Sequence, residues 1–249
     1  TTTDIQTGIN ARLKTILVRT GKGGKDGKFN CNPDFIFDDL DKAIDFILVD
    51  RYKYEVYIRE ILEKVERCRE RSPFLIGVSG LSRSGKSTFV NLLKKSLNDN
   101  SISTQFLSLD NWLVGAGERT DDMTVRQRYK CDEIVRDVGK LINHEKILLK
   151  IYNPYSREIV GEKFLSLDGI ECLVIDGVIT LDIDDLRNIL NIKIYVEIDE
   201  ECRKRRIFSF YKWKDLSEKD IECLYLQRIK DEVPFIEGSK MYADIIVKI

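Results

Sequence analysis

The sequence predicts an α/β fold: a parallel β-sheet with helices on both faces, preceded by an N-terminal helical appendage. After Pro73, short apolar runs alternate with stretches of helical periodicity, which is the pattern of a parallel sheet with crossover helices. Before Pro73, apolar residues recur at helical spacing among many charges. Because proline disfavours helix in the residue before it, we place a boundary there, between an appendage over residues 1–72 and an α/β domain over residues 73–249.

Composition narrows the classes of protein. The chain has 249 residues, of which 43% are hydrophobic, and its net charge is −1, so it can form a core and has no basic excess for nucleic acid or a membrane surface. It contains no run of about 18 apolar residues and no N-terminal signal-peptide pattern. Six cysteines are scattered without a C-x-x-C pair, and there is one histidine. We expect free thiols in a reducing cytoplasm.

The appendage has three segments of different character. Residues 13–18 are compatible with a short strand. Residues 21–28 are rich in Gly and Lys, but their glycines lack the spacing of a phosphate-binding loop, so we expect a flexible basic loop. Asn32, Pro33 and Asp34 favour the start of a helix. Apolar residues then follow at helical spacing in two stretches, namely Phe35, Leu40, Ile44, Ile47 and Leu48, and Val56, Ile58, Ile61, Leu62 and Val65.

The strongest motif opens the α/β domain. A strand is predicted for residues 74–78 and a helix for residues 89–97, and between them stands Gly80-x-x-x-x-Gly85-Lys86-Ser87. This strand–loop–helix context is the one that a phosphate-binding loop (P-loop) requires, so a chance Gly-rich turn is the weaker interpretation. In such loops backbone amides surround a phosphate, the lysine reaches the β- and γ-phosphates, and the serine binds Mg²⁺. The residues predicted to hold ATP are Gly80, Ser82, Arg83, Ser84, Gly85, Lys86, Ser87 and Thr88.

The remaining elements alternate as the fold class requires. Strands are predicted for residues 103–109, 147–151, 172–176, 192–198 and 242–249. Helices are predicted for residues 134–142, 181–190, 200–206 and 221–233, with a break at 213–217. Ligands of such sheets bind beyond the carboxyl ends of the strands, so the P-loop, Asp110 and Asp176 are expected around one crevice.

Two carboxylates follow predicted strands. Asp176 closes an apolar strand at the position where P-loop proteins hold an acid near Mg²⁺, although a turn-capping role would give the same pattern. Asp110 closes another strand, where a carboxylate can orient an acceptor hydroxyl and take its proton; an ordinary N-cap is the alternative. We favour the metal role for Asp176 and the catalytic role for Asp110.

A basic helix is predicted later in the chain, with four consecutive cations at residues 203–206. Such a run is usually a solvent-exposed helix face. In a phosphate-binding protein it can also neutralise the charge of a phosphoryl group in transfer. Arg203 and Arg206 share a helix face, and these two are predicted to do so.

Residues 74–249 resemble the uridine kinase and phosphoribulokinase family of P-loop kinases. The motifs that carry the resemblance are Ile-Gly-Val-Ser-Gly-Leu-Ser-Arg-Ser-Gly-Lys-Ser-Thr (76–88), Leu-Asp-Asn-Trp (109–112), Tyr-Asn-Pro-Tyr-Ser-Arg (152–157), Ile-Asp-Gly-Val (175–178), Arg-Lys-Arg-Arg-Ile (203–207) and Lys-Met-Tyr-Ala-Asp-Ile-Ile-Val (240–247). The resemblance implies that Asp110 is the base toward the acceptor hydroxyl and that Asp176, where the family usually has Glu, positions Mg²⁺. It also implies that Tyr152 lines the acceptor pocket and that Arg203 and Arg206, on a lid helix, contact phosphates.

The sequence departs from the uridine kinases around the acceptor. Their His-Pro-x-x-Phe-Asp stretch is replaced by residues 119–130, their Asp-Phe after the pocket Tyr by Asn153-Pro154, and their lid Arg-Gly-Arg by residues 212–214. The resemblance therefore implies kinase chemistry but not uridine as the acceptor. Additional arginines would suit an acceptor that carries phosphate or carboxylate, or are ordinary surface charge: Arg119, Arg126, Arg128 and Arg157. Arg128 and Arg157 are the two predicted to bind the acceptor.

Taken as a set, these features predict an ATP- and Mg²⁺-dependent kinase that phosphorylates a hydroxyl of a nucleoside-like, sugar-like or related small molecule. Pantothenate kinase-like and phosphoribulokinase-like activities stay open. The alternative is a nucleotide-binding regulatory protein that uses residues 1–72 for interaction. A GTPase is disfavoured because the chain lacks an Asn-Lys-x-Asp stretch for guanine. The expected partners are ATP and the acceptor, with neither nucleic acid nor membrane, and a homo-oligomer stays open.

Overall fold

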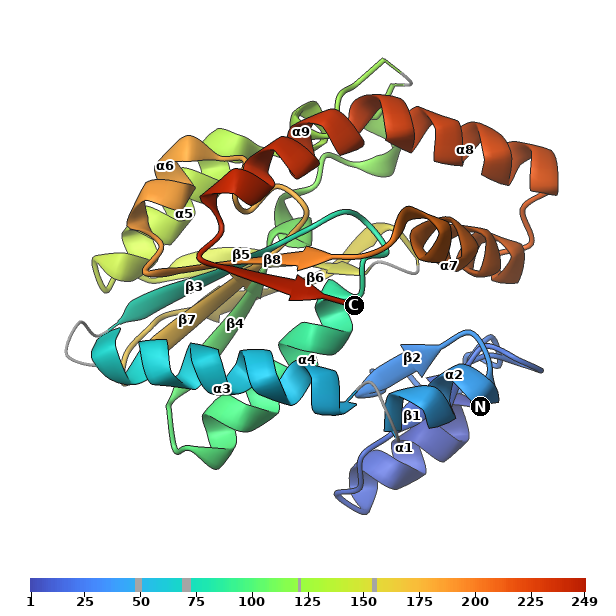
Figure 1. Ribbon diagram of the computed structural model, residues 1–249, viewed down its shortest axis with the longest axis horizontal. Helices are drawn as coiled ribbons and strands as arrows, with labels where there is room; N and C mark the ends of the chain where they lie inside the picture. The colour runs from blue at the N-terminus through green and yellow to red at the C-terminus, as the bar shows by residue number, and fades with distance from the viewer. Residues whose placement is uncertain (48–50, 69–72, 121, 154–155) are drawn as a thin grey trace.

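A five-stranded parallel sheet forms the centre of the computed structural model, which describes residues 1–47, 51–68, 73–120, 122–153 and 156–249. The strand order is β4-β7-β3-β8-β9 (Figure 1). The predicted parallel sheet is therefore confirmed, and each of its predicted strands is present. Their bounds are β3 (Phe74–Ser79), β4 (Thr104–Ser108), β7 (Cys172–Asp176), β8 (Ile192–Glu197) and β9 (Ile245–Lys248).

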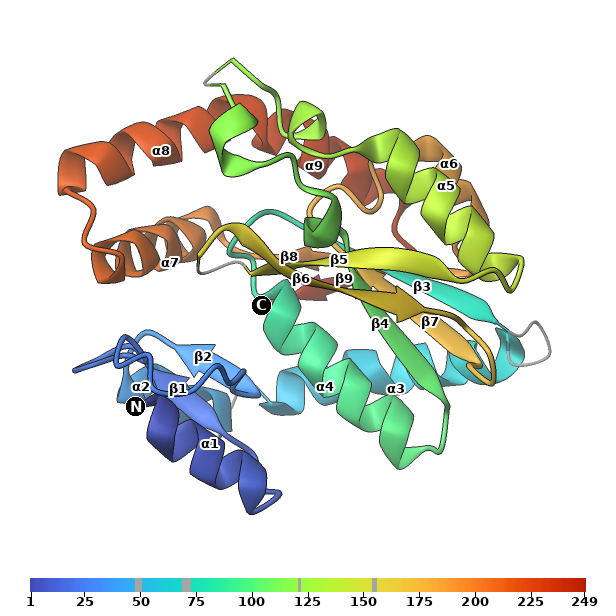
Figure 2. The same ribbon diagram turned by 180° about the vertical axis from the view of Figure 1, so that it is seen from behind.

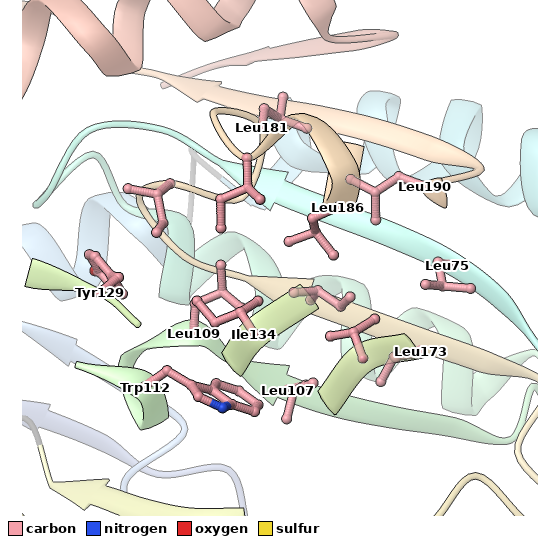
Figure 3. Packing of buried hydrophobic residues seen from close by; sticks show 14 of the residues in the cluster. Leu75, Leu107, Leu109, Trp112, Tyr129, Ile134, Leu173, Leu181, Leu186 and Leu190 are labelled. Atoms are coloured by element: carbon pink, nitrogen blue, oxygen red, sulfur yellow. The ribbon is translucent and has the colours of Figure 1, made fainter. Parts of the chain in front are cut away.

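Helices cover both faces of this sheet, as Figures 1 and 2 show from opposite sides. On one face lie α3 (Arg51–Cys68) and α4 (Lys86–Asp99); on the other lie α5 (Cys131–Ile142), α6 (Asp184–Ile189) and α9 (Val233–Ser239). Alternate side chains of β3 serve the two faces: Ile76 packs with α3 and α4, whereas Leu75 packs with α5 and α6. Figure 3 shows the hydrophobic cluster on the α5 and α6 side of the sheet, where Leu75, Leu107 and Leu173 from three strands face Ile134 and Leu186.

Two further helices, α7 (Glu200–Trp213) and α8 (Glu218–Asp231), pack against each other through a cluster of their own. The predicted break between them is present. Antiparallel strands β5 (Ile147–Asn153) and β6 (Glu158–Leu165) form a separate hairpin. The strand predicted for residues 147–151 thus continues further, and β6 was not predicted because its side chains are mostly exposed and show no apolar alternation. Pro154 and Tyr155 of the resemblance motif lie outside the described residues.

The N-terminal segment corrects one prediction. It contains helices α1 (Thr2–Asn10) and α2 (Leu40–Asp45), and also a parallel pair of short strands, β1 (Ile16–Val18) and β2 (Phe35–Phe37). A helix was expected to start directly after Pro33, but residues 35–37 pair with β1, and α2 begins only after Asp39, whose side chain accepts a hydrogen bond from the Lys42 amide. The other predicted strand, over residues 13–18, is present in part as β1.

Helix α3 packs directly on the central sheet. Ile61 and Val65 are fully buried in the cluster that also holds Phe74 of β3 and Phe89 of α4. The predicted domain boundary lies just before β3, and residues 69–72 beside it lie outside the described part of the chain. The domain boundary at residue 72 stays a prediction. A cut there would separate α3 from the core in which its apolar side chains are buried.

Candidate active site

The P-loop follows β3 and needs glycine at two positions. Gly80 has a φ of +144°, and a Cβ there would lie 2.4 Å from the Val196 carbonyl oxygen. Gly85 has a φ of +99° at the start of α4, with the Arg206 guanidinium 2.9 Å from where its Cβ would be. Both are left-handed backbone positions that strain other residues, so the glycines of the motif permit this loop shape.

Lys86 is folded over the loop. Its Nζ donates hydrogen bonds of 2.8 Å to the carbonyl oxygens of Gly80 and Leu81. Burial lowers the pKa of Lys86 to about 8, and the carboxylates of Glu232, Asp110 and Asp176 act in the opposite direction. The predicted lysine, base and metal acid therefore lie within electrostatic reach of one another. Ser87, the predicted Mg²⁺ ligand, is exposed, and Thr88 is partly buried.

Sheet register explains how the acids meet. Asp176 pairs with Val78 of β3 on one side and with Ser108 of β4 on the other. The P-loop and Asp110 leave the sheet directly after these two partners, so the carboxyl ends of three adjacent strands converge, as the crevice rule predicts. Burial, and then the Asp110 carboxylate, raise the pKa of Asp176 to about 7, while Lys86 lowers it.

The donor set fits a magnesium ion. The Asp110 carboxylate disfavours the ionisation of Asp176, and a divalent cation beside Asp176 would stabilise its ionised form. Mg²⁺ is typically held by one or two carboxylates together with water and substrate phosphates. Among the described residues no group of three or more His, Cys, Asp or Glu could hold a metal. The Asp176 carboxylate and the Ser87 hydroxyl thus fit Mg²⁺ that is shared with a phosphate, but not a site made by the protein alone.

Asp110 lies in a short 3₁₀ helix (Leu109–Trp112) that follows β4. The Tyr129 hydroxyl donates a hydrogen bond of 3.1 Å to its Oδ1. Burial and the Asp110 carboxylate raise the pKa of Tyr129 well above its usual range, so this hydroxyl stays a donor. Sequence reasoning missed Tyr129, because it stands in the irregular stretch after Asp110, where no periodicity marks it.

Glu232 is the second residue that sequence reasoning missed. It is buried between α8 and α9, and its carboxylate accepts a hydrogen bond from the Ser82 amide of the P-loop. It is also 4.0 Å from Nη1 of Arg203. Arg228 of α8 donates to the Ser82 hydroxyl. Nothing in the sequence around Glu232 marks a ligand; only the packing of the end of α8 on the loop reveals it.

The two predicted lid arginines have different surroundings. Arg206 donates from Nη1 to the Ser84 carbonyl oxygen of the P-loop at 3.1 Å. Arg203 is fully buried, and Glu200 accepts hydrogen bonds of 2.7 and 2.9 Å from its Nε and Nη2. The structure therefore brings Arg206 to the loop directly, whereas Arg203 approaches it through Glu232 within the described part of the chain.

The residues predicted to bind the acceptor lie in different places. A cavity of about 620 Å³ next to the Asp110 helix is lined in part by Asn111, Tyr152 and Arg157. Arg128 does not line this cavity; it is paired with Asp231 and donates to the Met123 carbonyl oxygen at 2.9 Å. Tyr152 and Arg157 thus share one cavity, of which Asp110 is not a lining residue, and Arg128 is held in an ion pair. Their roles toward an acceptor stay predictions.

Two further observations concern the cysteines and the helices. All six cysteines are free in the structure, as expected. Among the described helices, none has the length and apolar character that crossing a bilayer requires.

Comparison with known proteins gives different matches for the N-terminal segment and for the rest of the chain. Residues 1–43 match the model described as HAD-hydrolase-like. Uridine kinase of Limosilactobacillus reuteri (strain DSM 20016) is 28% identical over 187 residues, which cover 72% of this chain and 84% of that protein. Uridine kinase of Clostridium novyi (strain NT) is 29% identical over 184 residues, covering 70% and 86%.

Two solved structures share the fold. A putative fructose transport system kinase from Silicibacter sp. TM1040 superposes with a TM-score of 0.65 at 14% identity, covering 78% of this chain and 98% of that one. D-glycerate 3-kinase from Cryptococcus neoformans var. grubii superposes with a TM-score of 0.53 at 10% identity, covering 75% and 89%. Residues 75–249 match the family model itself, and the chain therefore belongs to the phosphoribulokinase / uridine kinase family and is an ATP-dependent small-molecule kinase.

Proposed function

We propose that this kinase transfers the γ-phosphoryl group of ATP, with Mg²⁺, to a hydroxyl of a nucleoside-like, sugar-like or related small molecule. The observation that carries the proposal is the convergence of Lys86, Asp110 and Asp176 at the ends of three neighbouring strands. A phosphate-holding lysine next to a carboxylate that can take a proton is what transfer to a hydroxyl needs.

The residues divide the reaction between them. The P-loop amides and Lys86 hold the β- and γ-phosphates, and Arg206 adds positive charge beside the loop. Asp110, oriented by Tyr129, accepts the proton of the hydroxyl as its oxygen bonds to the γ-phosphorus and the bond to the β–γ bridging oxygen breaks, which releases ADP. Ser87 and Asp176 would hold Mg²⁺, which neutralises phosphate charge when it is bound.

Glu232 must be displaced when phosphates enter the loop. Its carboxylate accepts a hydrogen bond from the Ser82 amide and faces Lys86. The backbone amide and the lysine are the groups that a P-loop offers to phosphate. Binding of ATP then exchanges one anion for another, which leaves the charge of the loop balanced in both states.

The acceptor is a molecule with a free hydroxyl that reaches Asp110 from the cavity lined by Tyr152 and Arg157. The relatives are named as uridine kinases and one solved structure as a D-glycerate kinase, so alcohols of both kinds are candidates. We place the enzyme in the cytoplasm, where its free cysteines stay reduced.

A screen of hydroxyl acceptors with detection of ADP release tests the proposal. Uridine, cytidine, pentoses, pentose phosphates, pantothenate and D-glycerate cover the neutral and anionic classes. We expect acceptor-dependent ADP release by the wild type and none by Lys86→Ala, which deletes a charge aimed at phosphates without changing the apolar core. Nucleotide binding without turnover in every mixture would instead favour a regulatory protein.

A further inference from the structure

Cations from three separate elements surround the ring of Phe210, near the end of α7. The Arg83 guanidinium, from the P-loop, is 3.3 Å from the ring centroid. The Arg19 guanidinium, which follows β1, is 4.7 Å from it, and the Lys214 Nζ is 5.0 Å from it. We call Arg19, Arg83 and Lys214 the Phe210 cluster. One of its members comes from outside the residues that match the kinase family.

The neighbouring Tyr211 brings two more cations. Its hydroxyl accepts hydrogen bonds from Arg228 at 2.7 Å and from Arg157 at 3.3 Å. Five positive side chains therefore gather on two adjacent residues of α7. Arg83 belongs to the P-loop, and Arg228 also donates to Ser82, so the gathering adjoins the phosphate-binding loop itself.

The cations of this cluster repel one another. Burial, and then Arg157, Arg83 and Arg19, lower the pKa of Lys214 to about 8. Aromatic rings offset part of such repulsion, because their faces attract cations. A bound anion would offset more, since like charges close together are stabilised most by a counter-charge between them.

Arg19 is held in place with hydrogen-bonding capacity to spare. Its side chain is only 12% exposed, and Nη1 donates to Asp38 at 2.8 Å. Its Nε is buried and has no hydrogen-bond partner among the described residues. The loop after Arg19 packs closely on the end of α7: a Cβ on Gly23 would lie 2.5 Å from Nε1 of Trp213, the last residue of α7.

We propose that Arg19, Arg83 and Lys214 form a binding site for a phosphate group, which the N-terminal segment completes with Arg19. The proposal deepens the proposed function and rests on it where the phosphate belongs to ATP. A phosphate carried by the acceptor has the same chemistry, and the site would bind it in the same way. In either case residues 1–47 take part in substrate binding.

Phosphate affinity in three variants of the full chain tests this proposal. Arg19→Gln removes the cation. Asp38→Asn breaks the Arg19–Asp38 ion pair but keeps the cation, so it controls for a merely structural role. Lys14→Gln removes a cation at the opposite end of β1, where Lys14 pairs with Asp34, and controls for net charge. Circular dichroism checks that each variant is folded.

Two probes distinguish the sources of phosphate: ATP alone, and inorganic phosphate in the presence of saturating ADP, each by calorimetric titration. We expect Arg19→Gln to weaken one of them about tenfold or more, the effect of losing a charge-assisted hydrogen bond. Weaker ATP binding assigns the site to the nucleotide. Unchanged ATP binding with weaker inorganic phosphate binding assigns it to a phosphorylated acceptor.

The control variants define the results that would overturn the inference. If Arg19→Gln binds both probes as the wild type does, or if Asp38→Asn or Lys14→Gln reproduces its effect, Arg19 only docks the N-terminal segment on α7 and the inference is wrong. A wild type that binds no ATP would instead contradict the proposed function. The inorganic phosphate arm would then still test the cluster by itself.

Discussion

At the scale of single residues, the site is a balance of buried charges. Lys86 lies among the carboxylates of Asp110, Asp176 and Glu232. Burial lowers the pKa of Lys86, and the negative charges of the three carboxylates act in the opposite direction. Such a group of charges is stable only while its members compensate one another. Adding phosphate or Mg²⁺ changes that compensation, and so does a change of pH near the pKa of Lys86 or of Asp176.

Replacing Glu232 with Gln should tighten nucleotide binding. The substitution keeps the shape of the side chain but removes the anion that faces Lys86 and the Ser82 amide. We expect the Kd for ATP to fall by roughly a factor of ten, which is about the effect of removing one close like charge. Glu237→Gln, an exposed position of α9, is the matched control. Weaker binding in Glu232→Gln would show that the carboxylate supports the nucleotide-bound loop.

Asp176 should make the folded state sensitive to pH. Its pKa is 3.8 ordinarily and about 7 in the folded chain, so the folded state keeps a proton that the unfolded chain releases between these values. The contribution of Asp176 to the free energy of unfolding is therefore fully present below pH 3.8 and is lost as the pH rises to about 7. We expect urea unfolding of Asp176→Asn, without Mg²⁺ or nucleotide, to show a smaller decrease over this window than the wild type. Parallel pH profiles for the two proteins would disprove the raised pKa.

At the scale of elements, the carboxyl ends of β3, β4 and β7 create the site. Their positions could be predicted because each strand is an apolar run followed directly by a polar signal: a P-loop after β3, Asp110 after β4 and Asp176 at the end of β7. The Phe35–Phe37 strand was not predicted, because Phe35 continues the helical spacing of the apolar residues after it and so short a run has no clear periodicity of its own. Pairing with β1 decides it, and that contact joins residues distant in sequence.

The same limit explains the site residues that sequence missed. Glu232 and Tyr129 reach the P-loop and Asp110 through tertiary packing, not through a motif of their own. Arg128 and Arg203 show the converse error, since a positive charge in the right region was expected to meet phosphate or acceptor. Arg128 is instead paired with Asp231, which is far away in the sequence, whereas Arg203 is paired with Glu200 one helical turn earlier in α7.

Gly80 gives a prediction for the loop as an element. Alanine at this position would combine a left-handed φ with a Cβ 2.4 Å from the Val196 carbonyl oxygen of β8. The backbone of β8 cannot move away easily, because it is hydrogen-bonded on both sides. We expect Gly80→Ala to lose ATP binding and to unfold at lower urea concentration, by about 1–3 kcal/mol for the strained backbone. Gly117→Ala, which has open space around it, should leave both measurements unchanged.

At the scale of the whole molecule, α3 and the segment before it pack largely against different parts of the kinase. Helix α3 buries Ile61 and Val65 against the sheet. The segment before it contacts α4 and the end of α7, and contributes Phe46 to the same core cluster. Amphipathic spacing predicted α3 correctly but could not show which surface covers it. The helix is therefore better described as part of the core of the kinase than of an appendage.

Two truncations separate these descriptions. Removing residues 1–50 deletes Phe46 from the core but keeps α3, so we expect the 51–249 chain to fold and to bind nucleotide. Removing residues 1–72 exposes the apolar surface beneath α3, and burial of large apolar side chains is worth about 1.5–3 kcal/mol each. The 73–249 chain should aggregate or unfold at lower temperature. Equal thermal stability of the two chains would restore the boundary at Pro73.

The destination of the γ-phosphoryl group tests the central claim most directly. With γ-labelled ATP and Mg²⁺, the wild type should move label onto an acceptor that carries a free hydroxyl. Asp110→Asn should bind ATP as the wild type does, because the P-loop holds the nucleotide, but transfer label about 10²–10⁴-fold more slowly for lack of the base. Label that appears only as inorganic phosphate, or transfer that persists at the wild-type rate in Asp110→Asn, would contradict this account.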